Sequence, residues 1–257
     1  MNYEQLDPLV LCFLVVAGFV ASFIDSTVGG GGLISTPALL ATGMPVPFAL
    51  GTNKVAAMLG SFTSVVTFWR AGNINKHLVL RLMPLSFCGS ALGAYVVYLL
   101  PAALMKNIIV VMLVAVAVYT FNRKDWGDES HVRRHTTSIV LLIIALAVGL
   151  GFYDGFFGPG TGSFLIFGFL FLGYDFVTAA GNAKALNFAS GAGALVSFAM
   201  AGTVYWTYGL AMGVSMIIGA IFGSRMAITK GAAYVRPLYL IVTTILIGKQ
   251  VYELFLK

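Results

Sequence analysis

Residues 151–162 read GFYDGFFGPGTG, and residues 18–32 read GFVASFIDSTVGGGG. In each stretch an aspartate, Asp154 or Asp25, ends an apolar run, and a glycine cluster follows it. A second and unusually short apolar run comes directly after each cluster. Two copies of one pattern in a single chain indicate an internal repeat.

The register of the two copies extends far beyond these motifs. Setting Asp25 on Asp154 gives an offset of 129, under which Gly29 meets Gly158 and Gly31 meets Gly160. One inserted residue makes the offset 130, which matches the pairs Gly43/Gly173, Gly51/Gly181, Lys54/Lys184, Phe68/Phe198, Gly72/Gly202, Gly89/Gly219 and Gly93/Gly223. We therefore expect a first repeat over residues 1–121, a linker over 122–137 and a second repeat over 138–257.

The composition indicates an all-α polytopic membrane protein. Apolar residues make up 59% of the chain and charged residues 9%, whereas a soluble domain has about 25% charged residues. No basic segment precedes the first apolar run, so it is interpreted as a retained span and not as a removable signal peptide. A soluble catalytic domain has no room here, and we do not expect an enzyme.

Ten apolar runs can be distinguished, five in each half: 9–24, 33–43, 48–69, 79–99, 104–121, 138–153, 162–174, 177–200, 205–224 and 234–255. A helix needs about 20 residues to cross the hydrocarbon core. Runs 33–43 and 162–174 are shorter, which predicts broken or re-entrant helices after the glycine-rich loops.

Basic residues predict the orientation. Three alternate loops carry ten of them: Arg70, Lys76, Arg81, Arg123, Lys124, Arg133, Arg134, Arg225, Lys230 and Arg236. The opposite side carries only Lys106 and Lys257. By the positive-inside rule the three loops are cytoplasmic, and both termini lie outside the bacterial inner membrane. Because each half has an odd number of runs, the second half is inverted relative to the first. If the first two runs of each half were re-entrant hairpins, the predicted side of every later loop would not change.

Other features point to structure more than to chemistry. The basic linker is interpreted as a topology signal that meets anionic lipid, so the bilayer is the expected partner and nucleic acid is not. The three histidines lack neighbouring ligands, and neither a metal site nor a cofactor is expected. Gly89/Gly93 and Gly219/Gly223 are typical of close helix packing between the repeats. A homo-oligomer is compatible with the sequence.

The glycine clusters are the first candidate for the site. Non-helical backbone inside a membrane must be buried in protein or line a wet cavity, and N–H groups at a helix N-terminus favour anions. We therefore place substrate binding at Gly29, Gly30, Gly31, Gly32, Gly158, Gly160 and Thr161. The alternative is that glycine serves only a tight turn.

Two lysines inside apolar runs are the second candidate. A lysine at membrane depth needs a partner or a water-filled path, and Lys54 and Lys184 occupy matching positions in GTNK and GNAK. They are predicted to hold an anion, with further donors from Asn53 and Asn187. The competing interpretation pairs Lys54 with Asp25 and Lys184 with Asp154, and these aspartates are candidates for proton coupling as well as for ion pairing.

These motifs together resemble the TauE/SafE family of sulfite and organosulfonate exporters. The resemblance rests on GFYDGFFGPGTGSF, GGGGLISTPALL, GTNK and the AK-x-x-N run at 183–187, and it covers nearly the whole chain. It implies a secondary transporter that exports small sulfur-containing anions such as sulfite, sulfoacetate or other organosulfonates. The difference between GGGG and GPGTG implies that the two half-sites are not equivalent.

Two other classes of membrane protein would use the same aspartates in other roles. A cation or metal transporter would use Asp25 and Asp154 as ligands, although the nearby lysines oppose this. An intramembrane aspartyl protease would use them as a catalytic pair that shares one proton. Its second motif, Gly-x-Gly-Asp, is absent from the sequence.

Overall fold

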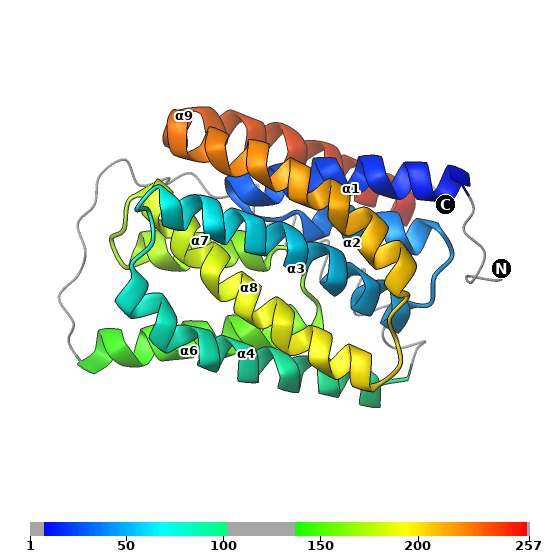
Figure 1. Ribbon diagram of the computed structural model, residues 1–257, viewed down its shortest axis with the longest axis horizontal. Coiled ribbons are helices and arrows are strands. Elements are labelled where there is room, and N and C mark those ends of the chain that lie inside the picture. The colour runs from blue at the N-terminus through cyan, green and yellow to red at the C-terminus, as the bar shows by residue number, and fades with distance from the viewer. Residues whose placement is uncertain (1–7, 102–136, 256–257) are drawn as a thin grey trace.

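The computed structural model describes residues 8–101 and 137–255. Within these ranges the chain forms helices connected by turns (Figure 1). The helices are α1 (Pro8–Val28), α2 (Gly32–Ala41), α3 (Val46–Arg70), α4 (Lys76–Leu99), α6 (Thr137–Phe156), α7 (Thr161–Phe171), α8 (Phe176–Met200) and α9 (Trp206–Phe255). The apolar run 104–121 and almost all of the predicted linker lie outside the described residues.

The helix bounds repeat along the chain. α3 and α8 each have 25 residues, and their first and last residues differ by 130 in number. α2 and α7 have 10 and 11 residues and begin 129 apart, at Gly32 and Thr161. The glycines after matching helices, Gly43/Gly173 and Gly72/Gly202, all have positive φ. These correspondences support the internal repeat that the sequence predicts.

The two short helices form hairpins with the helices before them. At 1.5 Å per residue, α2 and α7 are about half as long as the ~30 Å hydrocarbon core. In Figure 1, α1 begins and α2 ends at one end of the molecule, whereas α6 begins and α7 ends at the other. Short helices after the glycine loops are thus confirmed, and each hairpin returns to the end from which it came.

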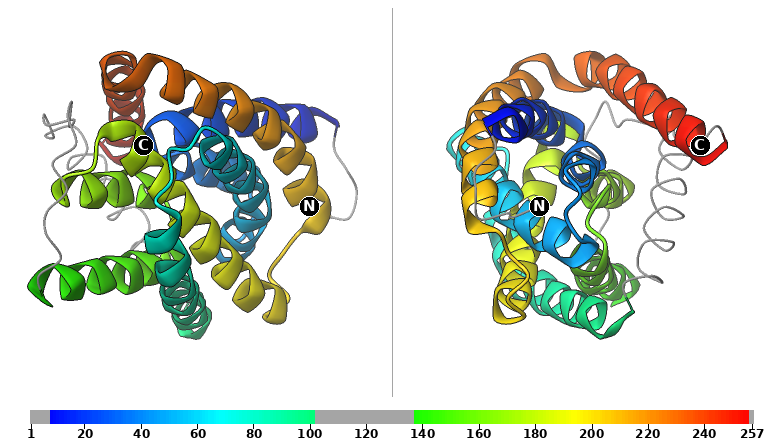
Figure 2. Two further views of the ribbon diagram at one scale, coloured as in Figure 1. Left: turned by 60° about the vertical axis from the view of Figure 1, so that its left-hand side comes forward. Right: turned by 90° about the vertical axis from the view of Figure 1, so that its right-hand side faces the viewer.

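Four described helices are long and apolar enough to cross a membrane, namely α1, α4, the part of α6 over Ile139–Phe156 and the part of α9 over Trp206–Gly231. They expose large apolar side chains such as Leu9, Leu99, Leu141 and Val214. α3 and α8 contact each other and are flanked by α9 and α4 (Figure 2). The outer helices therefore present the surface that suits lipid, and the inner pair carries polar residues. α9 breaks at Gly231, where φ is 61° and ψ is −161°.

The two halves interlock through small residues. α1 packs against α9 and α6 packs against α4. A Cβ atom at Gly93 would lie 2.1 Å from the Phe152 carbonyl oxygen, and one at Gly223 would lie 2.3 Å from the Phe23 carbonyl oxygen. Only glycine allows helices to approach so closely. The predicted packing role of the glycine pairs is confirmed.

Basic residues gather at one end of the fold. The C-terminal end of α3, the start of α4 and the break in α9 all lie at that end in Figure 1. Arg70 and Lys76 are the terminal residues of the first two elements, and Lys230 directly precedes the break. The turns 42–45 and 201–205, at the opposite end, contain no lysine or arginine. This asymmetry supports the predicted cytoplasmic side.

Candidate functional site

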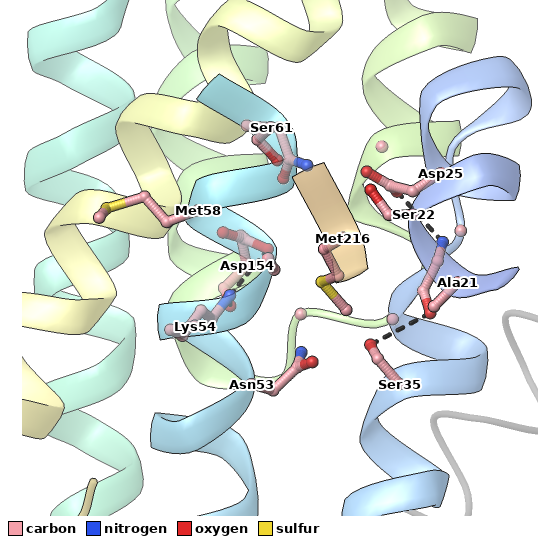
Figure 3. A pocket seen from close by; sticks show the side chains of 18 of the residues that line it. Ala21, Ser22, Asp25, Ser35, Asn53, Lys54, Met58, Ser61, Asp154 and Met216 are labelled. Atoms are coloured by element: carbon pink, nitrogen blue, oxygen red, sulfur yellow. Dashed lines mark hydrogen bonds and ion pairs between the residues drawn. The ribbon is translucent and has the colours of Figure 1, made fainter. Parts of the chain in front are cut away.

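A small cavity lies where the two glycine clusters meet, between α1, α3, α8 and α9 (Figure 3). Its volume is about 40 Å³, compared with about 10–15 Å³ that one water molecule requires on such a measure. Most of the predicted site residues line it, namely Asp25, Gly30, Gly31, Gly32, Asn53, Lys54, Asp154, Gly158, Gly160 and Asn187. The structure therefore brings residues from both halves to one place.

The two glycine turns differ in conformation. Gly29 and Gly30 have φ values of 75° and 85°, and Gly158 and Gly160 have φ values of 90° and 86°. Pro159 occupies the position that matches Gly30, and a proline ring keeps φ near −65°. The left-handed conformation consequently moves to Gly160 in the second turn. The predicted difference between GGGG and GPGTG is thus visible in the backbone.

The turns also pack directly on each other. A Cβ atom at Gly29 would lie 2.3 Å from the Ser163 nitrogen, and one at Gly32 would lie 2.9 Å from the Pro159 Cα atom. Gly29 does not line the cavity, because it faces the start of α7. Its role in the structure is close packing, whereas Gly30 to Gly32 reach the cavity wall.

Two ion pairs, one buried and one partly buried, connect the halves. The Lys184 ammonium lies 2.6 Å from Asp25 Oδ2, and the Lys54 ammonium lies 3.0 Å from Asp154 Oδ1. The pairing of Lys54 with Asp25 and of Lys184 with Asp154 is therefore wrong. Each lysine pairs with the aspartate of the other repeat. α1 packs on α9 and α6 packs on α4, so Asp25 on α1 lies beside α8 and Asp154 on α6 lies beside α3.

Each aspartate has a further hydrogen bond, and the two differ. The Gly31 N–H donates to Asp25 Oδ1 over 3.1 Å, while the Ser190 hydroxyl donates to Asp154 Oδ2 over 2.8 Å. Ser190 matches Gly60 at the offset of 130, so the first half has no counterpart of this hydroxyl. The half-sites are consequently unequal in their side chains as well as in their turns.

The lysines have unequal access to the cavity. Lys54 lines it and also donates to the Asp154 carbonyl oxygen. Lys184 is fully buried and lies outside the lining, with Asp25 as its partner. Only Lys54 is placed to meet a bound molecule directly in this conformation.

Backbone donors remain at the starts of both short helices. The N–H groups of Leu33, Ile34 and Ser35 bond to the Gly30 or Gly31 carbonyl oxygens. The N–H groups of Gly32 and Gly162 have no hydrogen bond to another described residue, and both glycines line the cavity. The first turn of a helix leaves such donors unpaired, so they are available to a ligand.

The predicted polar side chains fall into different environments. Asn53 is buried and donates to Thr36 Oγ1, and its Oδ1 has no partner among the described residues. Asn187 is half-buried at the cavity, and its side-chain amide has no partner among the described residues. Thr161 does not line the cavity, because its hydroxyl donates to the Gly158 carbonyl oxygen and stabilises the turn.

Sequence reasoning missed three serines at this site, of which Ser35 donates to the Gly31 carbonyl oxygen. Ser22 and Ser61 line the cavity from α1 and α3, and neither hydroxyl bonds to a described residue. Ser22 precedes Asp25 by three residues and Ser61 follows Lys54 by seven, so each lies on the helix face of a charged residue. Helical spacing from the buried charges is the signal that could have found them.

The cavity therefore has few groups with free bonding capacity. The two lysines and two aspartates cancel in formal charge and are paired with each other. Among the described residues around the cavity, the unpaired groups are the Asn53 Oδ1 atom, the Asn187 amide, the hydroxyls of Ser22 and Ser61 and the N–H groups of Gly32 and Gly162. Within residues 8–101 and 137–255, no group of three histidine, cysteine or acidic residues could hold a metal ion. This donor set suits a small polar molecule at membrane depth.

Hairpins that return to their own side, broken helices that meet at a polar cavity and matched halves are the architecture of membrane transporters. A family model described as sulfite exporter TauE/SafE matches residues 14–249. The chain belongs to the TauE/SafE family, and it is a membrane transporter rather than an enzyme.

Similar proteins are also named as membrane transporters. A probable membrane transporter protein of Sinorhizobium, named ORF9, is 40% identical over 91% of this chain and 89% of its own length. One from Haemophilus influenzae is 39% identical over 96% of both chains. The Escherichia coli protein YfcA, also a probable membrane transporter protein, is 36% identical over 97% of this chain and 92% of its own. No solved structure matches the chain.

Proposed function

We propose that this protein is a secondary transporter of small sulfur-containing oxyanions, that sulfite is its simplest substrate and that export is the direction. The observation that carries the proposal is the cavity between the two glycine turns, which joins one lysine to neutral hydrogen-bond donors. The name of the matching family supports the same substrate class.

The size and donors of the cavity favour a compact anion. A volume of about 40 Å³ suits an ion of a few heavy atoms better than a long organosulfonate. The Gly32 and Gly162 N–H groups, the two serine hydroxyls and the Asn187 amide can all donate hydrogen bonds. An oxyanion offers several acceptor oxygens, and helix N-termini favour negative charge. Sulfoacetate and other sulfonates would require a wider conformation of the same site.

The ion pairs give the aspartates a role in transport. Since Lys54 is already neutralised by Asp154, an anion gains the full attraction of the lysine only if this pair opens. A proton on Asp154 would remove the competing charge and leave Lys54 free for the anion. We therefore assign Asp154 as the candidate proton acceptor, with Asp25 as its counterpart at Lys184. Anion and proton would then move together.

A cation transporter is supported less well. A cation would need the Asp25 and Asp154 carboxylates as ligands, but each carboxylate faces a lysine at 3.0 Å or less. The lysine ammonium groups would repel a cation at the same place. The Asn53 Oδ1 atom, which has no partner among the described residues, suits a cation better than an anion.

The proposed frame has two inverted repeats, residues 1–121 and 138–257, in the bacterial inner membrane. Both termini are proposed to lie outside, because the basic residues at the ends of α3, α4 and the first part of α9 gather at one end of the fold. Alternating access would then move one repeat against the other around the cavity.

Ligand-dependent thermal stability of the purified protein tests this function. We expect sulfite to raise the unfolding temperature of the wild type and to have little effect on Lys54→Met. Sulfoacetate would give a smaller rise, because the cavity must widen. Arg81→Gln is the matched control, since it removes a positive charge outside the cavity lining and should retain the full response. Stabilisation by a divalent cation with none by sulfite would contradict the proposal.

A further inference from the structure

A second and larger groove lies on the outside of the molecule. It has a volume of about 640 Å³ and is formed by α3 and α9. Its residues come from the C-terminal half of α3 and from the last turns of α9 before the break at Gly231. The central cavity has no lining residue in common with it. The groove is therefore separate from the proposed transport site.

The walls of the groove are apolar, although three threonines contribute to them. Phe62, Val66, Ile221 and Ile228 supply large side chains, and Phe62 is 53% exposed. The threonine hydroxyls are occupied: Thr63 donates to Leu59 O, Thr67 to Thr63 O and Thr229 to Arg225 O. Because these bonds hold the hydroxyls against their own helices, the groove has little capacity to donate hydrogen bonds from its walls.

Two arginines supply the charge of the groove. Arg70 is the last residue of α3, and Arg225 lies on α9 six residues before Gly231. Both are exposed, and neither side chain forms an ion pair or hydrogen bond with another described residue. Two unpaired guanidinium groups above an apolar groove match a phosphate group that carries hydrocarbon chains, since arginine binds phosphate through paired hydrogen bonds.

The corresponding surface of the other half lacks this charge. At the offset of 130, Arg70 matches Met200 and Arg225 matches Tyr95. The groove thus breaks the symmetry of the repeats and lies at the end where the basic residues gather, the proposed cytoplasmic side. In that leaflet, basic pockets between membrane helices bind anionic lipid headgroups.

We infer that the groove between α3 and α9 is a binding site for one anionic phospholipid, with its phosphate between Arg70 and Arg225 and an acyl chain along Phe62, Val66 and Ile221. The bound lipid would bridge α3, which carries Lys54, to α9. It would thereby stabilise the arrangement in which the central cavity is formed.

Thermal unfolding in neutral detergent tests this inference with phosphatidylglycerol as the probe. We expect phosphatidylglycerol to raise the unfolding temperature of the wild type, and phosphatidylcholine with the same acyl chains to raise it clearly less. The R70Q/R225Q double variant should lose the difference between the two lipids. Arg81→Gln, a charge removal on α4 outside the groove, is the control and should keep it.

Native mass spectrometry provides an independent readout. Phosphatidylglycerol adducts should remain on the wild type and on Arg81→Gln, and their fraction should fall at least fivefold in R70Q/R225Q. Inorganic phosphate at millimolar concentration distinguishes a lipid site from a site for free anions. Equal lipid retention by the double variant, or stabilisation by phosphate alone as large as that by the lipid, would overturn the inference.

Discussion

The crossed ion pairs lead to a double-mutant prediction that depends on which aspartate faces which lysine. Lys184→Met removes the ion-pair partner of Asp25, and the partly buried Asp25 carboxylate then keeps one hydrogen bond to the described residues, from the Gly31 N–H. At a separation of 2.6 Å, the attraction between the charges is about 6 kcal/mol for an effective dielectric constant of about 20. Much of this offsets desolvation, so we expect the single variant to lose about 3–5 kcal/mol of unfolding free energy.

The partner substitution should restore much of that loss. Asp25→Asn with Lys184→Met leaves no uncompensated charge, and the two changes should couple by about 2–3 kcal/mol. Asp154→Asn with Lys184→Met combines residues that share no ion pair or hydrogen bond, and the two effects should add within about 0.5 kcal/mol. Chemical unfolding in detergent, followed by tryptophan fluorescence, measures both cycles. Coupling between Asp154 and Lys184 with additivity between Asp25 and Lys184 would refute the crossed arrangement.

Three further predictions follow from the fold and the site. The first uses a variant in which the exposed Cys12 and Cys88 are replaced by serine. In this background Ala71→Cys should react with an impermeant thiol reagent only from the cytoplasm, and Ala201→Cys, at the matching position of the second repeat, only from outside. Labelling of both from one face would contradict the inverted halves. Gly93→Ala should destabilise the protein by about 1–3 kcal/mol because of overpacking, whereas Gly149→Ala, whose Cβ would meet nothing within 4 Å, should not. Asn187→Leu should weaken sulfite binding about tenfold in isothermal titration and leave the unfolding temperature without sulfite unchanged, and an unchanged affinity would remove Asn187 from the site.

Much of the frame could be predicted from the sequence because it depends on short-range rules. The glycine pairs Gly43/Gly173 and Gly72/Gly202, the apolar runs and the offsets of 129 and 130 correspond to the helix bounds observed. The shortness of α2 and α7 followed from counting apolar residues against the membrane thickness. Glycine spacing likewise identified the packing of Gly89 and Gly93 against α6.

The partners of the buried charges could not be predicted in this way. Sequence proximity favoured pairing inside each half, but the choice depends on how the halves interlock, which is a long-range property. Matched hydrogen bonds illustrate the same point: Tyr205 N–H donates to Thr52 Oγ1, and Asn75 N–H donates to Asn182 Oδ1. Asn182 thus connects the repeats, and it does not line the cavity. The full burial of Lys184, with Asp25 as its partner, also results from the packing of the two halves against each other.

Sulfite transport by the purified protein in proteoliposomes is the most direct test of the account. Wild-type vesicles loaded with sulfite should release it faster than protein-free vesicles, and a proton gradient should change the rate, because we propose that Asp154 exchanges a proton when Lys54 binds the anion. Lys54→Met should reduce release to the protein-free level, while Arg81→Gln should match the wild type. Undiminished sulfite release by a correctly folded Lys54→Met protein would contradict the account.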